Sequence, residues 1–191
     1  MQHGFKTKAE RIACELRAKL ELAAHSPLPA KKLIVDHLEV LVLKPSEIPG
    51  LRPEVIHEIS NGGSEHWSAV TFYDASRRPL IIHNSNHAPT RQESDLMHEA
   101  AHIICNHPPG KIIQAGGLSL RSYNKDHEEE AKWLGACLQI TRSGLFWAIN
   151  RRMTMEQMVE YFGASEAQIR FRRNVTGVDV QMTRYSRASR S

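Results

Sequence analysis

The five residues HEAAH, at positions 98–102, constrain the fold of this chain more than any other part of its sequence. Side chains four positions apart lie one turn above each other on an α-helix, so His98 and His102 present their imidazoles on the same side. Glu99 lies in the same polar stripe. The opposite, apolar face of this helix is formed by Met97, Ala100, Ala101 and Ile104. We therefore expect an amphipathic helix here, ended by the Pro-Pro-Gly sequence at 108–110.

Two neutral imidazoles at this spacing form half of the ligand set that a zinc hydrolase uses. Bound zinc lowers the pKa of a water molecule, and an adjacent glutamate can then take the proton of that water. The motif therefore predicts a Zn²⁺ site with His98 and His102 as ligands and Glu99 as the general base.

A catalytic zinc site also needs a third protein ligand, for which a glutamate on a following helix is a recurrent choice. The sequence HEEE at 127–130 offers three candidates at the start of the next predicted helix. Glu128 shares a helical stripe with Ala131 and Gly135, whose small size would let two helices approach closely. Periodicity leaves Glu129 open as the alternative ligand, and acidic residues are also favoured at helix starts by the helix dipole.

The remaining pattern predicts one α+β domain with a small antiparallel sheet and a mostly helical C-terminal half. The strands at 68–73 and 79–84 are expected to form a hairpin, and 110–126 is expected to be a connection. The other predicted strand is at 38–43, and the predicted helices are at 5–24, 30–37, 90–107, 126–142, 143–149 and 154–174.

Composition is that of an ordinary globular protein, with 191 residues of which 41% are hydrophobic and 24% charged. The sequence has no run of 18 apolar residues, and residues 1–10 are too polar for a secretory signal, so we expect a cytoplasmic protein without a membrane partner. Cys14, Cys105 and Cys137 lie among apolar residues and are expected to be buried thiols, not disulfides.

The C-terminal part carries an alternative function. Residues 154–174 have the outline of a helix-turn-helix, with Gly163 in the turn and Ser165 as an N-cap. Basic residues crowd the end of the chain, namely Arg170, Arg172, Arg173, Arg184, Arg187 and Arg190. The alternative is a non-catalytic regulator that binds DNA or a protein partner through these helices, with a structural or vestigial metal. A helical hairpin that closes the domain is the favoured interpretation.

The sequence also resembles the ImmA/IrrE family of metallo-endopeptidases, which carry HExxH and, on a later helix, a pattern close to E-x-E-A-N-x-x-A. The resemblance covers most of the chain. The matching segments are KPSEI at 44–48, HEAAHIICNHPP at 98–109, EEEAKWLGACLQI at 128–140 and FGASEAQIRFRRNVTG at 162–177.

Position by position, the resemblance implies His98, His102 and Glu128 as zinc ligands and Glu99 as the general base. We expect a zincin-like metallopeptidase domain at 1–150, a helix-turn-helix-like hairpin at 151–176 packed on it, and a basic, flexible tail at 177–191. The implied activity is cleavage of a peptide bond in a specific intracellular protein, a DNA-binding transcriptional repressor. Nucleic acid is a second expected partner, through the basic C-terminal region.

The chain departs from the family pattern at Lys132, where Asn or Asp is usual, and at 139–142, where LLLP or LLMP is usual. A carboxylate or amide at the lysine position could orient a ligating histidine, so we expect that contact to be weakened or re-routed. The sequence identifies no transition-state stabiliser beyond the nearby polar residues Tyr123, His107 and His127.

Overall fold

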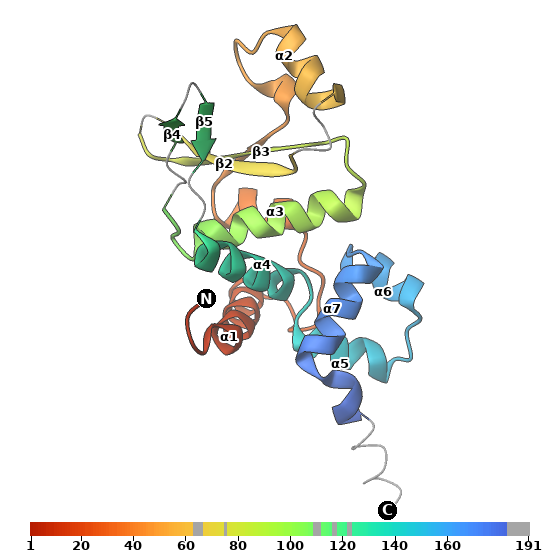
Figure 1. The fold of residues 1–191 in the computed structure, drawn as a ribbon. Helices are drawn as coiled ribbons and strands as arrows, with labels where there is room; N and C mark the ends of the chain where they lie inside the picture. The colour runs from red at the N-terminus through yellow and green to blue at the C-terminus, as the bar shows by residue number, and fades with distance from the viewer. Residues whose placement is uncertain (63–66, 75, 109–111, 116–117, 122–123, 183–191) are drawn as a thin grey trace, which may run out of the picture.

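The computed structural model describes residues 1–62, 67–74, 76–108, 112–115, 118–121 and 124–182. It has the α+β fold that the sequence predicts (Figure 1). The α-helices are α1 (Phe5–Lys19), α2 (Pro53–His57), α3 (Pro89–Ile104), α4 (Lys125–Gln139), α5 (Arg142–Asn150), α6 (Met155–Phe162) and α7 (Glu166–Thr176). The strands are β1 (Leu41–Leu43), β2 (Ala69–Tyr73), β3 (Pro79–His83), β4 (Ile112–Ala115) and β5 (Leu118–Arg121). Shorter helical turns are η1 (Lys32–His37), η2 (Pro45–Glu47) and η3 (Glu58–Gly62).

The larger sheet has the strand order β1-β3-β2. β2 and β3 pair antiparallel, which confirms the predicted hairpin. β1 pairs parallel with β3, with Leu41 opposite Leu80, so the sheet is mixed and not purely antiparallel as expected. The segment with η2, α2 and η3 connects the end of β1 to the start of β2, and β2 then returns the chain to the end of the sheet from which β3 runs parallel to β1.

The main core lies between this sheet and the helices α1, α3 and α4. In Figure 1, α3 runs beneath the sheet and α4 lies between α3 and α1. The apolar face predicted for the HEAAH helix is buried, because Met97, Ala100 and Ala101 have no exposed surface. Buried Arg17 ties α1 to α4 by donating to the carbonyl oxygens of Ala13, Ser26 and Leu138.

The helices α5, α6 and α7 share a second core, which includes Ile140, Leu145, Met158, Phe162 and Ile169. Figure 1 shows these three helices grouped beside the end of α4. The expected boundary at 150 falls between α5 and α6, whereas α5 packs with the two helices that follow it.

The predicted turn between α6 and α7 has the features that the sequence indicates. Gly163 has a φ of 60°, and the Ser165 side chain accepts a hydrogen bond from the Gln168 N–H. The Gln139 amide donates to the Gly163 carbonyl at 2.9 Å, which joins α4 to this turn. Val178 is fully buried and residues 178–182 are helical, so the first residues of the expected tail pack on the domain. Residues 183–191, with the last three arginines, lie outside the described part.

Two segments differ from the expected local structure. The first helix ends at Lys19 and not at 24. The expected connection at 110–126 contains β4 and β5, which pair antiparallel from Ile112 with Arg121 to Ala115 with Leu118. The signal for this pair is in the sequence, where Gly116-Gly117 follows the β-branched residues Ile112 and Ile113 and precedes LSLR, a run that alternates in polarity.

The three cysteines, Cys14, Cys105 and Cys137, are free thiols, as predicted, although only Cys137 is fully buried. Across the described ranges, every helix is too short or too polar to cross a lipid bilayer.

Candidate metal centre

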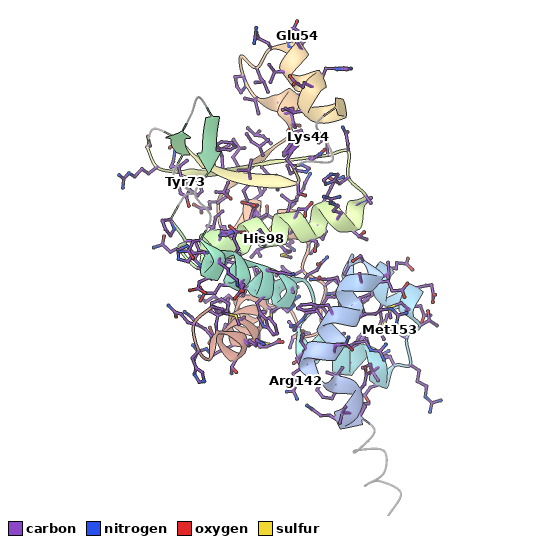
Figure 2. All side chains as sticks on the ribbon, viewed as in Figure 1. Lys44, Glu54, Tyr73, His98, Arg142 and Met153 are labelled. Carbon is purple, nitrogen blue, oxygen red and sulfur yellow. The ribbon has the colours of Figure 1, made fainter. Side chains whose placement is uncertain are left out.

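Two helices bring the predicted ligands together. α3 carries His98 and His102 on consecutive turns, and their rings lie edge to face with centroids 4.7 Å apart. α4 carries Glu128 in its first turn. The side chain of the N-cap residue Asn124 accepts hydrogen bonds there from the backbone N–H groups of Asp126 and His127. Figure 2 shows His98 on α3, at the side that faces α4. The three side chains therefore meet between the two helices, and all three are half-buried.

The ligand atoms of these three side chains lie at distances close to those of a tetrahedral zinc site. The His98 Nε2 atom lies 3.1 Å from the His102 Nε2 atom and 3.2 Å from a Glu128 carboxylate oxygen. The His102 Nε2 atom lies 3.5 Å from the other Glu128 oxygen. Zinc bonds of about 2.0–2.1 Å at tetrahedral angles place the ligand atoms about 3.4 Å apart. Two imidazoles and a carboxylate that face one point at these distances fit a single zinc ion.

Glu129, the alternative third ligand, lies elsewhere. Its side chain is 47% exposed, and one of its oxygens is 3.6 Å from the amino group of Met1. Within the described residues, the group of metal-ligand atoms around the two histidines includes Glu128 and not Glu129.

A glycine on α4 allows the close approach of the two helices. A Cβ atom at Gly135 would lie 3.1 Å from the backbone of Met97 and of His98. These distances are tighter than ordinary van der Waals contact, so a larger residue would push α4 away from the histidines. The small residues that the sequence analysis placed on the stripe of Glu128 thus face α3.

Glu99 contacts the sheet through one of its carboxylate oxygens. It is only 7% exposed, and the hydroxyl of Thr71 on β2 donates to its Oε2 atom at 2.5 Å. A buried carboxylate needs such partners, because an unpaired charge away from water is costly. The sequence gives no signal for the contact of Thr71 with Glu99, because periodicity does not show which strand residue faces a given helix residue.

Burial, reinforced by the neighbouring His98, lowers the pKa of His102 to about 4. Desolvation disfavours the charged imidazolium, so the ring stays neutral at physiological pH. A neutral imidazole keeps a free electron pair for a metal ion, which suits the role expected of this residue.

His107 is buried behind His102 and has both ring nitrogens engaged. Its Nδ1 atom lies 3.0 Å from the Nδ1 atom of His102, and its Nε2 atom lies 3.2 Å from the Glu130 carboxylate. It cannot therefore also serve as the transition-state stabiliser. Half-buried His127 stacks on it at 4.4 Å, and Tyr123 lies outside the described residues.

A cavity of about 400 Å³ opens beside His98. It lies between α3, α4 and α7, and its wall includes Asp95, Lys132, Ala167 and Phe171. Lys132, which departs from the family pattern, is exposed on this wall. A side chain of a bound polypeptide could enter the cavity next to the group of ligand atoms.

The three arginines of α7 form ion pairs within the described part of the chain. Arg172 is completely buried, where it donates to the carbonyl of Ile140 and pairs with Glu10 of α1. Arg170 pairs with Glu166, and Arg173 pairs with Asp179. Arg172 therefore cannot reach a DNA groove, which removes one of the six arginines that the sequence analysis named for the DNA-binding alternative.

Comparison with known proteins supports this picture at the level of the family. No curated protein matches the chain. A solved structure described as a Mycobacterium tuberculosis transcriptional regulator shares 11% identity with a TM-score of 0.49. That match covers 88% of this chain and 46% of the other, so the chain spans less than half of that protein.

The Peptidase_M78 family, described as the IrrE N-terminal-like domain, matches residues 62–174. This range is more than half of the chain and includes the HEAAH helix, α4, α5, α6 and most of α7. The chain thus belongs to the ImmA/IrrE family, through its IrrE N-terminal-like domain.

Proposed function

We propose that this chain is a zinc-dependent endopeptidase that cuts a peptide bond in a specific intracellular protein, a DNA-binding repressor. The observation that carries the proposal is the convergence of His98, His102 and Glu128 at zinc-ligand spacing. Buried Glu99 lies on α3, the helix that carries the two histidines. Membership of a metallopeptidase family supports it.

The residues divide the chemistry among them. His98, His102 and Glu128 would hold the zinc ion, which when bound lowers the pKa of a water molecule and polarises the peptide carbonyl. Glu99 accepts the proton from the attacking water and passes it to the leaving amine. The Thr71 hydroxyl fixes one oxygen of Glu99, so the other oxygen stays available for the proton.

Specificity is expected from the cavity beside His98. One side chain of the substrate would be enclosed by three helices there, which favours a narrow choice of sequences over general digestion. The helices α5 to α7 would then act as a module that shapes the substrate site, because α7 provides one of its walls.

The proposal is tested by mapping new N-termini in a proteome incubated with the zinc-loaded protein, with chelator-treated protein as the control. We expect a small number of metal-dependent cuts, concentrated in DNA-binding proteins. Broad digestion of unstructured substrates such as casein would contradict the specificity, and the absence of any metal-dependent cut would contradict the endopeptidase function.

Replacing Thr71 by valine should slow cleavage about tenfold without loss of zinc. The change removes a hydrogen bond to a buried carboxylate, and bonds to charged groups contribute about 1.5–3 kcal/mol. The measurement is kcat on the identified substrate, with Thr71→Ser as the matched control because it keeps the hydroxyl. Equal rates for the valine and serine variants would show that the hydroxyl does not position Glu99.

Replacing Ala167 by tryptophan should lower kcat/KM about tenfold or more while zinc content is unchanged. Ala167 is exposed on the cavity wall, so a large ring there fills space without disturbing the core. Ala18→Trp is the matched control, since Ala18 is an exposed alanine on α1, away from the cavity. Unchanged cleavage by the Ala167 variant would show that the substrate does not enter this cavity.

A further inference from the structure

We infer that His107 and Glu130 form a relay that positions His102 for the metal. The inference rests on the proposed zinc site and concerns how this chain holds one of its ligands.

The first link follows from the end of α3. Asn106 has a φ of 53°, a left-handed conformation that asparagine tolerates better than most residues. The N–H of His107 donates to the His102 carbonyl and the N–H of Asn106 donates to the Ile103 carbonyl, which is a Schellman helix end. This turn brings the His107 ring back against His102, with the two Nδ1 atoms 3.0 Å apart.

The direction of the hydrogen bonds follows from the ligand geometry. The Nε2 atom of His102 faces His98 and Glu128, so a metal ion there leaves the proton of His102 on Nδ1. That N–H must donate to the Nδ1 atom of His107, because two unprotonated nitrogens at this distance would repel. His107 then carries its own proton on Nε2 and donates it to Glu130 at 3.2 Å.

The Glu130 carboxylate is buried and has hydrogen-bond partners on both oxygens. Its side chain is 9% exposed, and its second oxygen accepts the backbone N–H of Gln2 at 2.9 Å. The His107 ring is fixed from the side by stacking on His127, with 7° between the two planes. Metal-ligating histidines are generally oriented by a partner on the second ring nitrogen, and loss of that partner typically weakens metal binding.

Lys132 takes no part in this relay. It is exposed and lies on the wall of the cavity beside His98, whereas the second nitrogen of His102 contacts His107. The relay thus gives His102 a partner that ends in a carboxylate, through one intervening imidazole.

The test is the zinc affinity of the full chain, measured by competition with a chromophoric chelator. We expect His107→Phe to weaken zinc binding 10- to 100-fold, because phenylalanine keeps the ring stack but offers no acceptor to His102. His107→Gln should restore most of the affinity, since its carbonyl accepts from His102 and its amide donates to Glu130. Glu130→Ala should weaken binding, and Glu129→Ala, on the exposed side of the same helix turn, should not.

The spectrum of the cobalt-substituted protein provides a second readout. We expect the ligand-field bands to shift in His107→Phe and to return in His107→Gln, whereas a loss of fold alone would lower thermal stability in both variants equally. Wild-type zinc affinity in His107→Phe, or equal weakening in the phenylalanine and glutamine variants, would overturn the relay and leave the proposed function standing. If the unmutated protein bound no zinc, the proposed function would fail and the relay with it.

Discussion

The variant Glu99→Gln should cleave its substrate about 10²- to 10⁴-fold more slowly while it still binds one zinc ion. Glutamine has the shape of glutamate but cannot take a proton, and general base catalysis typically contributes a factor of this size. Glu99 lies outside the group of ligand atoms, so zinc should remain. The Thr71 hydroxyl can still donate to the amide oxygen, so the fold should be kept.

Kinetics on the identified substrate and metal analysis on the same sample check this result. Glu129→Gln is the matched control, since the same chemical change falls on an exposed glutamate at the other helix. If Glu99→Gln retained more than half of the rate, Glu99 would not be the general base. If it lost its zinc, Glu99 would have to be counted among the ligands.

The variant Gly135→Leu should be destabilised by about 3 kcal/mol and should lose most of its zinc affinity. Even a Cβ atom would come within 3.1 Å of the α3 backbone at Met97 and His98, and overpacking a close helix contact costs about 1–3 kcal/mol or more. Separation of α4 from α3 would also move Glu128 away from the two histidines.

A graded series gives this prediction its control. Gly135→Ala, measured by thermal unfolding with and without zinc, should show a smaller loss than the leucine variant. Lys132→Leu, on the exposed side of α4, should leave both stability and zinc affinity near the unmutated values. If Gly135→Leu matched Lys132→Leu in both measurements, the close helix contact would not be needed for the site.

The sequence predicted the parts of this protein that depend on local periodicity. The HEAAH helix with its buried apolar face, the hairpin of β2 and β3, and the glycine turn before α7 are all found where the pattern placed them. These features follow from the spacing of residues within one or two elements, so one sequence suffices to predict them.

The features that the sequence missed depend on contacts between distant segments. The parallel pairing of β1 with β3, the hydrogen bond from Thr71 to Glu99 and the contact of His107 with Glu130 each join residues far apart in the chain. Arginine is usually exposed, but the Ile140 carbonyl and Glu10 allow Arg172 to be buried. No pattern along one helix reveals such partners.

The most direct test of the account is the zinc content per chain by elemental analysis, for the unmutated protein and for His102→Ala, Glu128→Ala and Glu129→Ala. We expect about one zinc per chain in the unmutated protein and in Glu129→Ala, and a loss of zinc in the other two, because three ligand atoms are needed to hold the ion. An unmutated protein that binds no zinc even after reconstitution, or a Glu128→Ala variant that keeps its zinc, would contradict the proposed metal centre.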